Sequence, residues 1–346
     1  MDGKHKEPGP TSDSWFGTAV RGLVPIGVAS CAALVIGGGV DLVHQHQASG
    51  KKERAAKPAA EQDETGPRHV VGVRDQGAAL VVRDVRTGHD VGLPIAAPRG
   101  QRFQRVAVAG ERSFVVATKA GAQVTFQKLR LSEDGEPQKL TGLPNATVGG
   151  ASTASTAWSD LAVEPATDRI AYVTYRRGGG SRVDVVSADG TGRKAWTSKA
   201  PARIGNLSWA GSTLSFVYTP VKKAAGRTVH QLRTLDTNAA PGDLRASKAV
   251  MRLPKGTAAA VLSRDGRSVL AGAVRNGQLT VQSYDAATAA TGAPAKALWK
   301  GRLAGAAPRL DLDHTGEHVL AAGSDGRLRG PAGQSVPAED LLDAAW

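Results

Sequence analysis

Residues 314–318 (HTGEH) have the residue types and spacing of a zinc protease motif. In the HxxEH pattern, two histidines on one helical face bind zinc and a glutamate acts as base. Here a glycine stands at the centre of the segment, which occupies the same place in a sequence repeat as residues 264–267 (RDGR). A β-turn cannot place both histidines on one helical face. The sequence therefore predicts a tight turn at residues 314–318 and no zinc chemistry.

Other catalytic signatures are absent from the sequence. It contains no GxSxG, Walker A, GxGxxG or EF-hand pattern, and an SxxK match at residues 49–52 falls in a polar linker. The single cysteine, Cys31, lies in an apolar N-terminal run, so the globular part has no thiol for disulfide, zinc or nucleophilic chemistry. We therefore predict no catalytic residue, metal or cofactor. An alternative stays open. Ser, His and Asp residues from scattered positions could form a catalytic set, and the protein would then be an envelope hydrolase or lyase that uses a central funnel.

Charge is the one surface pattern in the sequence that suggests binding. The formal net charge is +13, and it belongs to residues 69–346 because residues 1–21 and 41–68 are each neutral overall. Turns after the second strand of each expected four-stranded unit carry mainly cations: Arg74, Lys119, Arg176, Arg177, Lys222, Lys223, Arg227, Arg275 and Arg327, beside Asp75 and Asp325. Turns after the third strand carry mainly carboxylates: Glu133, Asp134, Asp189, Asp236, Asp243 and Asp285, beside Arg86 and Arg193.

This distribution predicts a ring with one basic and one acidic rim, because all turns of one class emerge on one face of such a ring. A basic rim attracts anionic partners, most strongly at low salt. The candidate binding residues are Lys119, Arg176, Arg177, Lys222, Lys223, Arg227, Arg275 and Arg327. The alternative is that turns simply collect solvated charge, which contributes little to binding.

A strand, a tight turn and a second strand recur about six times between residues 69 and 346. The clearest copies are residues 161–173, 207–217, 260–274 and 310–323, with turns roughly every 50 residues. Such a period predicts an all-β fold, a six-bladed β-propeller with four antiparallel strands in each blade. The first blade, from residue 69 to residue 95, has only three strands. Residues 341–346 (LLDAAW) match the innermost-strand pattern of residues 206–211, so we predict that they complete this blade and close the ring.

The tryptophans follow the same repeat. Trp209 and Trp346 end inner strands, Trp196 and Trp299 lie near the ends of outer strands, and Trp158 precedes an inner strand. This placement predicts core packing for the tryptophans rather than a cage for a ligand.

Three segments resemble the repeat of TolB-like, WD-repeat-like β-propellers. They are residues 182–197 (RVDVVSADGTGRKAWT), 263–272 (SRDGRSVLAG) and 81–91 (VVRDVRTGHDV). The resemblance implies a propeller fold, and such motifs specify no partner. The chain has a predicted anchor and stalk in place of the N-terminal domain of envelope TolB, so a Tol-system role is not implied. The expected order of a short cytoplasmic tail, one membrane span and a propeller resembles that of membrane-anchored propellers of high-GC Gram-positive bacteria.

Residues 22–40 form a run of nineteen uncharged positions, long enough to cross a bilayer as one helix. The predicted divisions are a cytoplasmic tail (1–21), a transmembrane helix (22–43), a disordered stalk (44–68) and the propeller (69–346). Two alternatives stay open: a signal peptide cleaved near residues 48–50, and a lipoprotein acylated at Cys31 after the lipobox-like residues 28–31. Both flanks of the run carry lysines and arginines, so the extracytoplasmic placement of the propeller rests on the resemblance alone.

These features together predict a non-catalytic scaffold of the cell envelope, held in the cell membrane by its N-terminal helix. Its partner is expected to be a protein or an anionic envelope component, and the domain is expected to be monomeric. Nucleic acid is not an expected partner, because basic and aromatic residues do not interleave. A second alternative is an accessory membrane regulator, linked to signalling or sigma-factor control, whose short tail contacts a cytoplasmic partner as a peptide.

Overall fold

The computed structural model describes residues 66–221, 228–292, 294–303, 309–323, 325–331 and 335–346. All of the described residues belong to one compact unit, Glu61–Trp346. The predicted tail and transmembrane helix, Cys31 and the stalk as far as residue 65 lie outside the described residues. Within the described ranges, no helix combines the length and the apolar character needed to cross a membrane.

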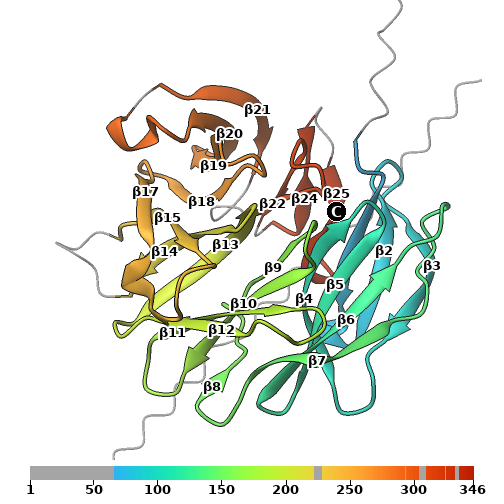
Figure 1. Cartoon of the computed structure of the whole chain (residues 1–346). Coiled ribbons are helices and arrows are strands. Elements are labelled where there is room, and N and C mark those ends of the chain that lie inside the picture. Colours follow the sequence, from blue (N-terminus) through green and yellow to red (C-terminus); the bar gives the residue numbers. More distant parts are fainter. Residues whose placement is uncertain (1–65, 222–227, 293, 304–308, 324, 332–334) are drawn as a thin grey trace, which may run out of the picture. The chain divides into compact units, whose positions relative to one another are not determined.

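The described residues form six sheets, the blades of a propeller, arranged around a common centre (Figure 1). From the innermost strand outward, blade 1 consists of β26 (Leu341–Ala345), β1 (His69–Arg74), β2 (Ala79–Asp84) and β3 (Asp90–Ala96). Blade 2 consists of β4 (Arg102–Gly110), β5 (Ser113–Ala120), β6 (Gln123–Arg130) and β7 (Thr141–Gly149). Blade 3 consists of β8 (Thr153–Ala154) and β9 (Leu161–Glu164), which both pair with β10 (Arg169–Arg176), then β11 (Ser181–Ser187), β12 (Lys194–Thr197) and β16 (Gly242–Asp243).

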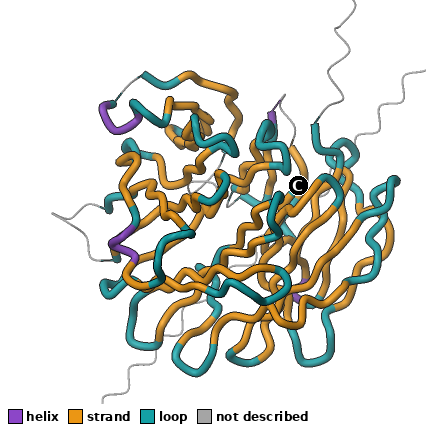
Figure 2. The backbone as a smooth tube through the Cα atoms, in the orientation of Figure 1, coloured by secondary structure: helices purple, strands orange, loops and turns teal. Residues whose placement is uncertain are grey.

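The remaining three blades have the same plan. Blade 4 consists of β13 (Ala202–Ala210), β14 (Thr213–Pro220), β15 (Gln231–Asp236) and β17 (Lys248–Arg252). Blade 5 consists of β18 (Thr257–Leu262), β19 (Ser268–Arg275), β20 (Gln278–Asp285) and β21 (Lys296–Arg302). Blade 6 consists of β22 (Arg309–Leu312), β23 (Val319–Ala322), β24 (Arg327–Arg329) and β25 (Ser335–Pro337). Three short 3-10 turns, η1 (Asp75–Gly77), η2 (Leu244–Ala246) and η3 (Ala289–Thr291), are the helical elements among the described residues (Figure 2).

The second strand of each blade is an apolar run because it is covered on both faces. In β10, five consecutive residues from Ile170 to Thr174 are buried, and β19 shows the same pattern. Neighbouring blades supply the cover, so these strands do not alternate between apolar and polar positions. The outermost strands β3 and β21 are mostly exposed. The prediction of an all-β, six-bladed propeller is therefore confirmed. Because the second strands are buried on both faces, they appear in the sequence as apolar runs that repeat from blade to blade.

The C-terminal strand closes the ring. β26 pairs antiparallel with β1, with Val71 opposite Ala345 and Gly72 opposite Ala344. Trp346 follows β26 and is only 3% exposed, in an apolar cluster that includes Val70 of blade 1 and Leu320 of blade 6. The predicted closure is therefore confirmed, and it removes the unpaired inner edge that blade 1 would otherwise expose.

A strap from blade 4 covers the outer edge of blade 3, a feature that the repeat does not predict. β16 lies in the connection between the third and fourth strands of blade 4 and pairs in parallel with β12 of blade 3. The indole of Trp196 donates to Ala240 O (3.1 Å), and Lys194 Nζ donates to Thr237 O (3.0 Å) and Asn238 O (2.8 Å). The outer edge of blade 3 is thus protected from pairing with other chains.

Residues 314–318 lie in the turn between β22 and β23, as predicted. Asp313 organises this turn, because its Oδ1 accepts from Gly316 N (2.8 Å) and its Oδ2 lies 3.1 Å from His318 Nδ1. The second histidine of the HxxEH pattern is therefore engaged within its own turn. Within the described ranges, no group of three His, Cys, Asp or Glu residues has the geometry to hold a metal ion.

Candidate functional site

The antiparallel order of the strands gives the ring two distinct faces. Turns between the second and third strands of each blade, and the links between blades, emerge on one face, which we call the mouth face. The links add exposed cations that the sequence prediction did not include: Arg99, Lys199 and Lys255, beside Glu339 and Asp340. The remaining turns emerge on the opposite face, where the predicted carboxylates lie.

The described residues of the predicted basic rim differ in their surroundings. Arg176, Arg177 and Arg275 are exposed. Lys119 is half-buried, with its Nζ 3.4 Å from Ser155 O, and Arg327 is half-buried, with its Nε donating to Ser335 Oγ (2.8 Å). Lys222, Lys223 and Arg227 lie outside the described residues.

A cavity of about 490 Å³ opens at the centre of the mouth face, and we call it the funnel. It is lined by residues of the inner strands β4, β13, β22 and β26 and by the 157–160 link that precedes β9. Arg105, Trp158, Asp160, Arg203, Arg309 and Asp343 are its principal polar and aromatic lining residues. The funnel therefore collects side chains from several blades at one place, as expected for a binding site in a propeller.

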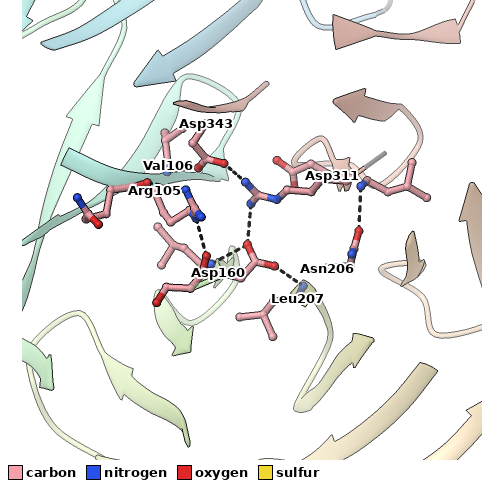
Figure 3. Close-up of polar contacts among 12 residues, drawn as sticks. Arg105, Val106, Asp160, Asn206, Leu207, Asp311 and Asp343 are labelled. Carbon is pink, nitrogen blue, oxygen red and sulfur yellow. Dashed lines mark hydrogen bonds and ion pairs between the residues drawn. The ribbon is translucent and has the colours of Figure 1, made fainter. Parts of the chain in front are cut away.

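An ion network forms the floor of the funnel (Figure 3). Arg309 Nη2 lies 2.9 Å from Asp160 Oδ1, and Arg309 Nη1 pairs with Asp343 Oδ1. The other oxygens of these carboxylates accept from the main chain of further blades: Asp343 Oδ2 from Val106 N (2.8 Å) and Asp160 Oδ2 from Leu207 N (3.0 Å). One arginine and two aspartates thus link blades 1, 2, 3, 4 and 6 across the centre of the ring.

The network keeps Arg309 charged. Burial alone lowers the pKa of Arg309, but the nearby carboxylates of Asp160, Asp343 and Asp311 outweigh burial and raise the pKa above its ordinary value. Both oxygens of Asp160 and of Asp343 accept from donors of the described chain, so these carboxylates serve as structural links between blades.

Asp311 lies beside this network, and burial disfavours the charged form of its carboxylate. Burial raises the pKa of Asp311 to about 6, although the cations Arg309 and Arg264 act in the opposite direction. Its Oδ2 is buried and has no hydrogen-bond partner among the residues that the structure describes. Asp311 lines a void of only about 10 Å³, which cannot admit a substrate.

We expect Asp311→Asn to stabilise the protein at pH 8 and to have little effect at pH 4. A pKa raised from 3.8 to about 6 makes the folded state bind the proton more tightly than the unfolded state does. The stability that Asp311 contributes is therefore present below pH 4 and lost as the pH rises through 6. The difference corresponds to about 2 to 3 kcal/mol in the free energy of unfolding. Urea unfolding of the unchanged protein and of Asp311→Asn at pH 4, 6 and 8 measures this difference. An equal effect of the substitution at every pH would contradict the raised pKa of Asp311.

Trp158 is the one described tryptophan whose predicted place in the core is wrong. Trp196, Trp209 and Trp346 are buried and Trp299 is half-buried, but Trp158 is 54% exposed. It belongs to the link before β9 and not to a strand of the blade. The guanidinium of Arg203 lies 3.7 Å from the centre of the Trp158 ring, a cation–π contact at the lip of the funnel.

The main chain that carries Trp158 is held in place. Arg105 Nε and Nη2 each donate to this link, to Ser159 O and Ala157 O, both at 2.5 Å. Tyr175 Oη donates to Trp158 O (3.1 Å), and burial raises the pKa of Tyr175 to about 12, so the hydroxyl keeps its proton at neutral pH. These contacts fix the orientation of Trp158 without covering its ring.

The charge of Arg203 is not neutralised within the described part of the chain. Arg203 is exposed and contacts Trp158, and no hydrogen bond or ion pair with another described residue involves its guanidinium. Leu342 also lines the funnel and is 49% exposed. The lip therefore presents an aromatic ring and an available guanidinium, residue types enriched where proteins bind other proteins, with an exposed leucine beside them.

Comparisons with known proteins do not indicate a function for this chain. No protein-family profile matches the sequence, and no curated protein is similar to it in sequence. Solved structures with a similar chain path include TolB from Acinetobacter baumannii, with 14% identity over 81% of this chain and 67% of that chain and a TM-score of 0.48. They also include the periplasmic gluconolactonase PpgL of Pseudomonas aeruginosa, with 14% identity over 80% of this chain and 98% of that chain and a TM-score of 0.45.

These neighbours include both TolB and a gluconolactonase. At such identities and scores they carry no argument about activity. The six-bladed assignment rests on the strand pairing of the chain itself. The expected setting, the envelope of a high-GC Gram-positive bacterium, stays a prediction.

Proposed function

We propose that this protein is a membrane-tethered, extracytoplasmic propeller that binds an acidic segment of a partner protein at the funnel lip and catalyses no reaction. The observation that carries the proposal is the exposed pair of Trp158 and Arg203 at 3.7 Å, set on the basic mouth face. The uncharged run at residues 22–40 supports the tether.

A protein segment fits the lip better than a small anion does. Carboxylates of the partner would replace water around Arg203, and its apolar side chains would cover Trp158 and Leu342. The other exposed cations of the mouth face, among them Arg176 and Arg275, would attract the segment over longer distances and speed its association.

The titratable groups of the funnel support binding over catalysis. Asp160 and Asp343 are engaged in the ion network, and His230 Nδ1 lies 2.8 Å from Thr219 Oγ1. Burial lowers the pKa of His230, which is therefore mainly neutral at pH 7. Among the described lining residues, these contacts leave no carboxylate and histidine facing each other as an acid and base pair.

A labelled acidic peptide tests the proposal. We expect a fluorescent dodecapeptide of Glu-Leu-Asp repeats to bind the detergent-solubilised full chain, and Arg203→Glu or Trp158→Ala to weaken binding about 10-fold or more. Fluorescence anisotropy measures both, and affinity should fall as salt rises. The matched control is Arg267→Glu, an equal charge change at an exposed position on the opposite face, which should leave the affinity within about 2-fold.

Three outcomes would overturn the proposal. Arg203→Glu and Arg267→Glu could weaken binding equally, which would show that only net charge matters. A Gln-Leu-Asn peptide could bind as tightly as the acidic one, which would remove the role of charge. Anionic vesicles could bind the full chain through Arg203 while the peptide does not, which would replace the protein partner with a lipid surface.

A further inference from the structure

A second pocket lies at the seam between blades 5 and 6, and it is smaller than the funnel. Its volume is about 290 Å³, and it is lined by the outer strand β21 of blade 5 and by β24 and β25 of blade 6. We call it the seam pocket and define it by Trp299, Lys300, Arg302, Arg327, Arg329 and Ser335. Arg327 also lines the funnel, whereas Lys300 and Arg302 do not.

Two guanidiniums of the seam pocket are held in fixed orientations by their neighbours. Arg329 is only 8% exposed, and its Nη1 donates to Asp325 Oδ1 (2.9 Å). Arg327 Nε donates to Ser335 Oγ (2.8 Å). Arg329 Nη2 also donates to Asp325 Oδ2, so the charge of Arg329 is already paired. Arg327 is ordered by Ser335, and an anion that binds Arg327 would not bear the entropy cost of ordering it.

The pocket carries more positive charge than its own acceptors neutralise. It has four cationic side chains, and Asp325 is the carboxylate that pairs with one of them. Lys300 and Arg302 are exposed, and neither forms an ion pair or hydrogen bond with a side chain in the described ranges. Cations held this close repel one another, so a bound anion with more than one negative charge would be stabilising.

The geometry points to a phosphoryl group as the ligand, and we propose that the seam pocket binds a phosphate ester of a sugar or polyol. Arginine forks match phosphate oxygens, and a dianion offsets more of this charge than one carboxylate does. The volume exceeds what a phosphate ion needs, which leaves room for an attached group. The half-buried ring of Trp299 borders that space and offers the apolar surface on which a sugar ring packs.

Titration calorimetry of the detergent-solubilised full chain with glucose 1-phosphate tests the proposal. We expect Lys300→Gln and Arg302→Gln each to weaken binding about 10-fold, since each removes one charge-assisted contact. The matched control is Arg252→Gln, because Arg252 ends the outer strand of blade 4 as Arg302 ends that of blade 5, and both are exposed. Arg252→Gln should bind within about 2-fold of the unchanged protein.

Two further titrants identify what the pocket recognises. Glucose should not bind, and inorganic phosphate should bind more weakly than glucose 1-phosphate because it lacks the group that covers Trp299. Equal binding of inorganic phosphate would overturn the ester assignment. Equal losses in Arg252→Gln and Arg302→Gln, or no binding of glucose 1-phosphate, would overturn the site itself. Lys300→Gln and Arg302→Gln should change the affinity of the acidic peptide by no more than about 2-fold, because neither residue lines the funnel, so the two proposals fail independently.

Discussion

Arg309→Ala is expected to lower the free energy of unfolding by about 3 to 5 kcal/mol, because it leaves the buried carboxylates of Asp160 and Asp343 without their cation. These carboxylates have 6% and 5% of their side-chain surface exposed, so water cannot replace the lost charge. Removing the arginine also disconnects blade 6 from blades 1 and 3 at the centre of the ring. Urea unfolding followed by tryptophan fluorescence measures the change.

Two comparisons show how much of the lost stability comes from the ion pairs of Arg309 and how much from its aliphatic side chain. Adding Asp343→Asn to Arg309→Ala should restore part of the stability, because one unpaired charge is then gone. Arg112→Ala, which removes an exposed arginine 3.8 Å from Glu133, should change stability by no more than about 0.5 kcal/mol. If Arg309→Ala is as mild as Arg112→Ala, the network does not hold the ring together.

Trp346→Ala is expected to lower the free energy of unfolding by about 3 to 5 kcal/mol, the usual effect of removing a buried tryptophan. The indole is 3% exposed and fills the contact between blades 1 and 6. The lost packing lies between blades 1 and 6, where the ring closes, so the rate of unfolding should rise as well. Denaturant unfolding at equilibrium and stopped-flow unfolding measure the two effects.

Trp158→Ala provides the control for the closing tryptophan. It removes the same side chain from a site where the ring is 54% exposed, so the cost should stay below about 1 kcal/mol. Trp346→Phe should be milder than Trp346→Ala, because most of the apolar volume is kept. Equal costs at the two tryptophans would contradict the assignment of Trp346 to the joint.

The sequence predicts the blades and the closure because both depend on short local patterns. Tight turns at Gly211 and Gly266 have positive φ angles (56° and 73°), which favour glycine, and the flanking apolar runs mark strands that are buried on both faces. Residues 341–346 repeat the innermost-strand pattern, and this similarity is enough to place the last strand beside the first.

The central contacts could not be predicted in the same way. A repeat shows where strands occur, but Arg309 and Asp160 meet only because two distant blades face the same axis. Asp160 stands outside a strand, and nothing in its neighbourhood marks it as a partner of an arginine. The position of Trp158 before an inner strand predicts a place in the core, whereas the link that carries Trp158 runs along the lip of the funnel.

The distribution of charged residues over the two faces of the ring is only partly predictable from the sequence. The strand order gives each turn a face, as the repeat predicts, whereas the basic rim as a binding surface stays a prediction. The contribution of the links between blades, including Arg99 and Lys199, required the structure, since the links have no repeated pattern. Arg203 lies at the start of β13 and in none of the turns, so the charge pattern of the turns does not predict it.

Photo-cross-linking of the acidic peptide to the full chain tests the central claim, docking at the funnel lip, most directly. Benzoylphenylalanine would replace Leu342 at the lip in one protein and Glu317, an exposed residue on the opposite face, in another. We predict a cross-link from position 342 that excess unlabelled peptide abolishes, and none above background from position 317. A cross-link from position 317 as strong as that from 342 would contradict docking at the lip.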